Sequence, residues 1–316
     1  GYMYVVSDGC YYGALLYSPE RKFLGFYGAN QVNATLSSVL TNIWNRMFPN
    51  AEKHANSIKK LPYALVDITV DEDGFVFTSN GFTDLSTDAR KAMIRRLSPG
   101  TGDNILKPGG VFGDVKTLAL DDMWKQDFCD IEVDENGFMY ALDSRYGKVF
   151  VYDSDCNTVT TFGGGMKKGN QKGTFMTSCA IVVKNNGEQI LVADASTGFI
   201  TAFNINEYGK KVKELDFLTL DGNYDMVKEG WQEVLAQDAN SQLAYSGLAN
   251  AYLEEEDYDT ALKYAKMGYD KGTYAVAFEY VRKDFISDNF TWIFILIVVL
   301  VVGAIAFMFI TNKKKV

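Results

Sequence analysis

The feature that most constrains the fold is a short sequence unit that recurs three times in the first two thirds of the chain. Each copy begins with Ile-x-Val, continues into a polar turn and ends on a glycine; the copies are 68–74, 131–137 and 181–187. Alternating apolar residues are typical of a half-buried strand, and Asp-Gly or Asn-Gly supplies the positive φ of a tight hairpin. The unit therefore predicts three antiparallel hairpins of one design.

A second regularity follows two of these hairpins. An aspartate precedes a glycine, a β-branched residue and an aromatic residue by four, six and nine positions, starting at Asp143 and again at Asp194. Similar aromatic strands occupy 1–4, 74–77 and 137–140. Four strands per unit, repeated about every 50 to 70 residues, is the pattern of a β-propeller blade. Residues 1–206 are therefore predicted to form about four blades, the first without its opening strand.

The segment 131–164, IEVDENGFMYALDSRYGKVFVYDSDCNTVTTFGG, resembles an NHL repeat. This resemblance implies a mainly β fold, an NHL-type β-propeller, and NHL propellers usually have more blades than are counted here. Residue 1 is Gly, and no signal peptide precedes the first strand. We therefore expect a fragment whose propeller is incomplete at its N-terminal side.

The predicted long insertions all fall on one face of the propeller, where the second-to-third-strand loops and the blade-to-blade loops emerge. They occupy 29–64, 80–93, 107–128 and 164–178. We interpret this as a binding face, although surface loops also tolerate insertion without any function. The ligand-binding candidates on this face are Arg145, Tyr146, Lys167, Lys168 and Lys172.

The longest insertion has helical spacing, so a helical insertion is predicted at about 31–60, broken at Pro49. It is a lid, a partner-docking hairpin or a helix packed over its own blade edge. The chain's only histidine, His54, lies within it and is interpreted as a surface residue.

The period changes after Asn206. Tyr224, Val227, Trp231 and Val234 recur 34 residues later as Tyr258, Ala261, Ala265 and Gly268, and this is the tetratricopeptide (TPR) period. Residues 207–289 are therefore predicted to form a TPR-like helical module with a trailing helix. The module holds 9 basic and 17 acidic residues, so the run 254–257 is interpreted as a solvated acidic turn, with a cation or basic-peptide site as the alternative.

The C-terminal part contains 19 uncharged residues from Trp292 to Ile310, which is about the length that crosses a bilayer as a helix. We predict a transmembrane helix over 290–311 and a cytoplasmic basic tail over 312–316. Trp292 is the expected interfacial anchor. The cluster Lys313, Lys314 and Lys315 places the C-terminus in the cytoplasm and the propeller outside the cell.

The chain offers few residues for chemistry. A single histidine and four cysteines without a CxxC pair argue against zinc and against triad catalysis. The segment 153–157 imitates a calcium loop but lacks the glycine and glutamate that such a loop needs. The glycine-rich stretch at 163–169 is no P-loop and is interpreted as a flexible loop. We therefore predict no catalytic residues, no metal and no cofactor. The net charge of −9 argues against nucleic acid as a partner.

Three hypotheses follow. The first is a non-enzymatic, membrane-anchored extracellular module that binds a protein or solute and couples it to membrane machinery. The second is a metal-dependent, gluconolactonase-like propeller hydrolase, and the third is a cytoplasmic NHL scaffold. The stretches 207–209, 221–224, 231–235 and 282–286 also resemble Firmicutes proteins that continue into a Yip-type membrane domain. That resemblance implies an accessory role in solute transport.

Overall fold

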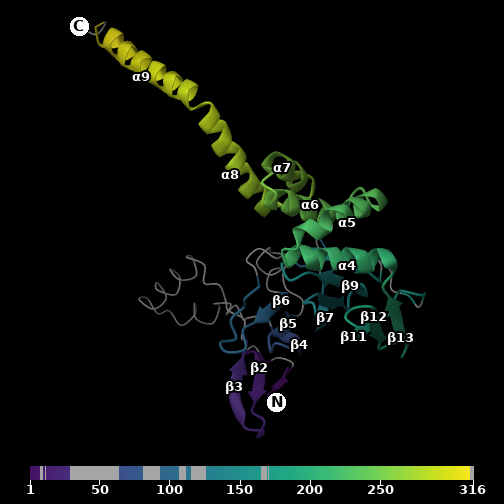
Figure 1. Ribbon diagram of the computed structural model, residues 1–316. Coiled ribbons are helices and arrows are strands. Elements are labelled where there is room, and N and C mark those ends of the chain that lie inside the picture. The colour runs from purple at the N-terminus through teal and green to yellow at the C-terminus, as the bar shows by residue number, and fades with distance from the viewer. Residues whose placement is uncertain are drawn as a thin grey trace, which may run out of the picture. The chain divides into compact units, whose positions relative to one another are not determined.

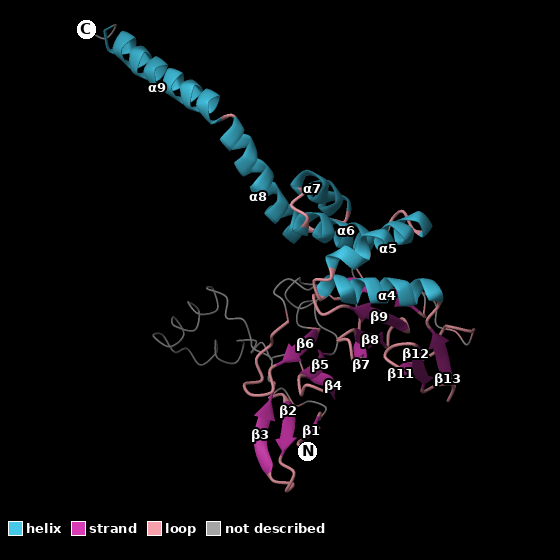
Figure 2. Ribbon diagram, viewed as in Figure 1, coloured by secondary structure: helices cyan, strands magenta, loops and turns pink. Residues whose placement is uncertain are grey.

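The computed structural model describes residues 1–7, 10, 12–28, 64–80, 93–106, 112–114, 126–164, 169 and 171–313. The chain forms two compact units, Gly1–Asn206 and Glu207–Val316. The described strands all belong to the first unit and the described helices to the second (Figure 2). The fold is therefore mainly β with a helical part. The predicted helical insertion at 31–60 and His54 lie outside the described residues.

The first unit contains four antiparallel sheets, in each of which strands that are consecutive in sequence pair (Figure 1). The strands of the first two sheets are β1 (Met3–Val5), β2 (Ala14–Tyr17), β3 (Phe23–Tyr27), β4 (Leu65–Val70), β5 (Val76–Asn80) and β6 (Ile94–Leu97). Those of the last two are β7 (Phe128–Val133), β8 (Met139–Asp143), β9 (Lys148–Tyr152), β10 (Thr158–Phe162), β11 (Ser178–Lys184), β12 (Gln189–Asp194) and β13 (Ile200–Asn204).

The three predicted hairpins are confirmed. They join β4 to β5, β7 to β8 and β11 to β12, with antiparallel registers. Their glycines all have positive φ: +85° at Gly74, +82° at Gly137 and +80° at Gly187. A side chain at these positions would be strained, which explains why each copy of the unit ends on glycine.

Over the described residues, the prediction of four strands per unit is wrong for two of the sheets, because only the sheet β7–β10 has four strands there. In the sheet β4–β6, the described residues form an isolated bridge between Leu97 and Asn104 where a fourth strand was expected. In the last sheet the chain leaves β13 and begins a helix at Glu207, so no fourth strand follows β13 in the described sequence. The first sheet has the three strands that were expected.

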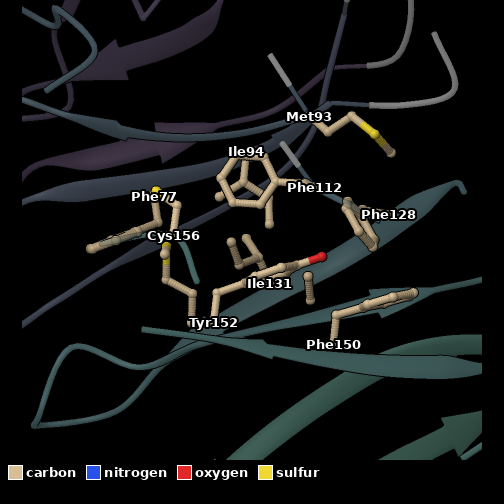
Figure 3. Close-up of a cluster of buried hydrophobic side chains, with 11 residues drawn as sticks. Phe77, Met93, Ile94, Phe112, Phe128, Ile131, Phe150, Tyr152 and Cys156 are labelled. Carbon is tan, nitrogen blue, oxygen red and sulfur yellow. The ribbon is translucent and has the colours of Figure 1, made fainter. Parts of the chain in front are cut away.

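Apolar packing between successive sheets forms the core of this unit. On one side of the sheet β7–β10, Ile131, Phe150 and Tyr152 pack against Phe77 and Ile94 of the preceding sheet (Figure 3). On its other side, a second cluster joins the same sheet to residues of β11 and β12. Every residue of β8 is buried, because both faces of this sheet are covered. Strand β8 therefore does not show the polar–apolar alternation of a half-exposed strand.

A close backbone approach holds the start of the predicted glycine-rich loop. Gly163 and Gly164 have φ of +72° and +58°, and a Cβ on Gly164 would lie 2.1 Å from the carbonyl oxygen of Tyr146. Gly164 N donates to Gly173 O at 2.8 Å. These two glycines therefore pack against the β8–β9 turn, where no side chain would fit.

The second unit consists of six described helices: α4 (Glu207–Leu220), α5 (Tyr224–Gln237), α6 (Gln242–Glu254), α7 (Tyr258–Met267), α8 (Lys271–Asp288) and α9 (Phe290–Lys313). From α4 to α8, each helix contacts the next. Side-chain oxygens of Ser241, Asp257 and Asp270 accept from backbone amides at the N-termini of α6, α7 and α8. These caps set where the three helices begin.

The residues that repeat with a period of 34 form the centre of this packing. Val227, Trp231 and Val234 of α5 are fully buried, and so are Ala261 and Ala265 at the matching positions of α7. The indole Nε1 of Trp231 donates to Thr219 Oγ1 at 2.9 Å. The indole ring is thus buried in apolar contacts while its N–H group has a hydrogen-bond acceptor, as a buried tryptophan requires.

Gly247 in α6 generates a prediction about this packing. A Cβ there would lie 2.2 Å from the Trp231 Nε1 atom, whereas a Cβ on Gly272 in α8 meets only the Asp270 Oδ1 atom at 3.4 Å. Alanine normally stabilises a helix interior by about 0.5–1 kcal/mol relative to glycine. Gly272 is the second residue of α8, so we expect Gly272→Ala to raise the free energy of unfolding by less than that amount, and Gly247→Ala to lower it by about 2 kcal/mol through overpacking. Urea unfolding followed by the helical circular dichroism signal measures both; equal stabilisation by the two variants would contradict the packing described.

Candidate functional site

A cavity of about 510 Å³ opens where three turns of the first unit meet. The turns are the β4–β5, β7–β8 and β11–β12 hairpins, and Ser154 of the β9–β10 turn also lines it. The lining residues are Val70, Asp71, Glu72, Asp73, Arg96, Val133, Asp134, Glu135, Asn136, Gly137, Ser154, Val183, Asn185 and Asn186. Three successive sheets thus contribute equivalent positions of the repeat to one site.

Those equivalent positions divide the lining into apolar and polar parts. Val70, Val133 and Val183 are the valines of the three Ile-x-Val motifs. The residues after them carry carboxylate or amide oxygens, so the lining has five carboxylates and one guanidinium, that of Arg96. The lining is therefore mostly polar, with the three valines as its apolar part, whereas most small-molecule sites are mainly apolar with a few polar groups.

Two of the carboxylates are structural. Asp71 Oδ1 accepts from the backbone N of Phe75 at 2.7 Å, and Asp134 Oδ1 accepts from the backbone N of Phe138 at 3.0 Å. Asp134 Oδ2 also accepts from the hydroxyl of Tyr140 at 2.9 Å. Both aspartates therefore brace their own turns. The third turn begins with Lys184, and there Asn185 and Asn186 adopt positive φ, both 51°.

The other three carboxylates do not hold the turns together. Within the described part of the chain, no hydrogen bond or ion pair engages the side chains of Glu72, Asp73 or Glu135, and all three residues are exposed. Arg96 is different: it lies 3.6 Å from Asp71 Oδ2, and its guanidinium stacks 4.1 Å from the ring centroid of Phe75. The single cation in the lining is therefore held by the protein, and the three exposed carboxylates remain available.

Below the turns, two carboxylates link successive sheets. Asp67 Oδ2 accepts from the backbone N of Ile131 at 3.1 Å, and Asp130 Oδ2 accepts from the backbone N of Ile181 at 2.8 Å. Burial and a hydrogen bond with Asp67 raise the pKa of Asp130 to about 7, and burial raises the pKa of Glu132. Each link joins the first strand of one sheet to the first strand of the next.

The aspartates that the sequence repeats also have structural roles. Asp143 Oδ1 accepts from the backbone N of Asp127 at 3.0 Å and of Arg145 at 2.9 Å. Asp194 accepts in the same way from the backbone N of Met176 and Ser196. Each aspartate therefore ties its turn to the segment that enters the sheet. Asp153 accepts from the backbone and the side chain of Asn157, as expected for a hairpin turn.

The predicted ligand-binding residues lie at the other ends of the strands from the cavity. Exposed Arg145 and half-buried Tyr146 occupy the β8–β9 turn. Exposed Lys172 lies on the segment that pairs with Gly164 beside this turn, so the structure brings these parts together. Lys167 and Lys168 lie outside the described residues. Strands β8 and β9 have five residues each, so about 16 Å separates these residues from the cavity end.

Sequence reasoning did not single out the cavity residues, because it associated function with the long insertions. The short turns were treated only as hairpins. A usable signal was present, since acidic or amide side chains recur directly before the glycine in all three turns. Among the described residues, no group of three or more His, Cys, Asp or Glu is arranged to hold a metal ion.

The predicted membrane-anchor residues belong to α9. Trp292 is 74% exposed, Lys313 is the last residue of the helix, and Lys314 and Lys315 lie outside the described residues. Over the described residues, where the part of α9 that counts ends at Ile305, no single helix has the length and hydropathy expected of a membrane span. The helices 271–288 and 290–305 satisfy those criteria only as a pair, and they are bent by 73° at their junction.

Comparisons with known proteins found structural similarity only. No family model matches the sequence, and no curated protein matches it. One similar structure is described as the extracellular domain of a one-component system from B. thetaiotaomicron, with 13% identity, a TM-score of 0.35 and coverage of 66% of this chain and 20% of that one.

Two further structures are similar to this chain. One is a protein of unknown function from Bacteroides caccae, with 10% identity, a TM-score of 0.29 and coverage of 66% of this chain and 62% of that one. The other is a virginiamycin B lyase from Staphylococcus aureus, with 12% identity, a TM-score of 0.25 and coverage of 65% and 56%. The chain spans less than two thirds of the length of each of the three proteins.

The Asp130 link predicts how the stability of the first unit depends on pH. Its raised pKa means that the folded state holds a proton that the unfolded state has lost between about pH 4 and pH 7. The free energy of unfolding of the first unit therefore falls as pH rises through this window. Burial also raises the pKa values of Glu132, Asp143 and Asp153, and these groups change the stability in the same direction.

Asp130→Asn keeps an oxygen acceptor for Ile181 N but removes the ionisation. We expect the variant to protect the β11 amides more than the wild type at pH 8, by about 1–2 kcal/mol after solvent screening, and equally at pH 4. Hydrogen exchange measured by mass spectrometry, corrected for intrinsic exchange rates, reports this difference. The same pH dependence in both proteins would show that Asp130 does not carry the effect.

Proposed function

We propose that the chain is a non-enzymatic binding module whose ligand occupies the cavity formed by the three hairpin turns. The cavity carries this proposal, because its lining offers three exposed carboxylates and an apolar surface at equivalent positions of three sheets. The succession of antiparallel sheets, each packed face to face with the next, supports an NHL-type β-propeller as the scaffold. The 34-residue period and the buried residues of α5 and α7 support a TPR-like second unit.

We propose further that α9 anchors the module in the cell membrane with the propeller outside. Three features support this. Helix α9 has 24 residues, or about 36 Å at the usual rise, and none of its residues before Lys313 is charged. Apart from half-buried Ile293, its large apolar side chains from Phe290 to Ile305 are exposed, which is costly in water and favourable in lipid. Lys313 ends α9, and Lys314 and Lys315 follow it in the sequence, a basic cluster typical of a cytoplasmic flank.

This arrangement fits an extracellular module that recognises a solute or a protein and couples it to membrane machinery. The resemblance to Firmicutes proteins with a Yip-type domain suggests a transport accessory as the broader role. The five carboxylates of the lining favour a solute with hydrogen-bond donors over one with acceptors.

Protease shaving of intact cells tests the orientation. The protein carries an epitope tag in the exposed β2–β3 turn, and a cytoplasmic protein serves as the internal control. We expect the tag to be cleaved while the cytoplasmic control survives. Protection of the tag until the cells are opened would instead support the cytoplasmic scaffold.

A lysine variant tests the reason for the orientation. Replacing Lys313, Lys314 and Lys315 by glutamine removes the charge bias that keeps the C-terminus inside. We expect a mixed population in which part of the tag becomes protected, whereas Lys283→Gln on the entry side should leave cleavage complete. Full cleavage in the triple variant would mean that the three lysines do not set the topology.

A further inference from the structure

We propose that the cavity binds a small organic cation with several separated amino groups, a polyamine or a compound of that kind. This inference rests on the proposed function and names the ligand class of the same site. It begins from the way in which charge is distributed over the lining. Glu72 and Asp73 lie on the β4–β5 turn, and Glu135 lies on the β7–β8 turn of the next sheet. A ligand in the cavity therefore faces carboxylates on more than one side.

Separation of these carboxylates argues for an extended cation over a metal ion. A divalent ion needs several oxygen ligands that converge within about 2.0–2.6 Å of one point. No such group of three carboxylates exists among the described residues. Turn positions on different sheets keep their charges apart, and a chain with an amino group every few carbon atoms can meet them one by one.

The three valines of the lining provide an apolar surface that suits the methylene segments of a polyamine. Val70, Val133 and Val183 line the same cavity from three sheets. A polyamine has methylene segments between its nitrogens, and these segments gain free energy when they leave water for an apolar surface. An inorganic cation and a sugar have no comparable apolar segments.

The remaining polar groups agree with a ligand that donates hydrogen bonds. Asn136, Asn185 and Asn186 place amide groups beside the carboxylates. Ammonium groups donate several hydrogen bonds and accept none. The one cation of the lining, Arg96, is paired with Asp71 and stacked on Phe75, so its charge is partly neutralised by the protein. A volume of about 510 Å³ is in the range of small-molecule sites.

Isothermal titration of the full chain in neutral detergent with spermidine tests the proposal. We expect saturable binding at low ionic strength that weakens as salt is added, because the contacts are partly exposed charge pairs. At equal ionic strength, butylamine and Mg²⁺ should bind at least about tenfold more weakly, since each can satisfy only one of the separated charges.

Variants locate the site. Glu72→Gln combined with Glu135→Gln keeps the size and the hydrogen-bonding capacity of both side chains but removes two charges from the lining. We expect this double variant to weaken spermidine binding at least about tenfold. Glu20→Gln is the matched control, because Glu20 is an exposed carboxylate on the β2–β3 turn that does not line the cavity. It should bind like the wild type and so corrects for attraction to the chain's net charge of −9.

Three results would overturn the proposal: no saturable heat with spermidine, equal affinity in the double variant and the wild type, or Mg²⁺ or a short lysine peptide binding at this site as tightly as spermidine. Unchanged circular dichroism of the double variant confirms that the fold is retained. The test is independent of membrane orientation. Protection of the tag in the shaving experiment would contradict the proposed extracellular location and leave the proposed ligand class intact. Absence of spermidine binding would contradict the ligand class and leave the proposed location intact.

Discussion

The first unit depends on apolar contact between successive sheets. A single antiparallel sheet of three or four short strands cannot bury both of its faces. The sheet β7–β10 solves this by packing one face on the preceding sheet and the other on the following one, so that Ile131 and Val149 are completely buried on opposite sides. The same stacking brings the three hairpin turns to one place. The cavity is therefore a product of the core, since no turn could form it alone.

Much of this arrangement could be predicted from the sequence. The alternation and the terminal glycine of each repeated unit identified all three hairpins, because only a few backbone conformations satisfy an Asp-Gly or Asn-Gly turn. The 34-residue period identified the buried side of α5 and α7. Local patterns of this kind depend on neighbouring residues and remain visible in the sequence.

The rest depended on contacts between distant parts of the chain. The number of strands in the second and last sheets was overestimated, because the pattern of the unit does not show where a strand is replaced by a bridge or a helix. The cavity was missed for a related reason. Glu72 and Glu135 are 63 positions apart, and only the stacking of their sheets makes them neighbours in one site. Repeated aspartates such as Asp143 were visible in the sequence, but their hydrogen bonds to backbone amides identify them as turn braces.

The links made by Asp67 and Asp130 have a consequence for how such a chain can evolve. Each carboxylate accepts from a main-chain amide of the next sheet, and the side chain of that next residue is not involved. An amide is present at every position except proline. A unit that carries the aspartate can therefore be followed by almost any other unit without a matching substitution. Duplication, loss or exchange of whole units leaves this junction intact, so an array of such sheets can change in length while its ligand-facing turns diverge independently.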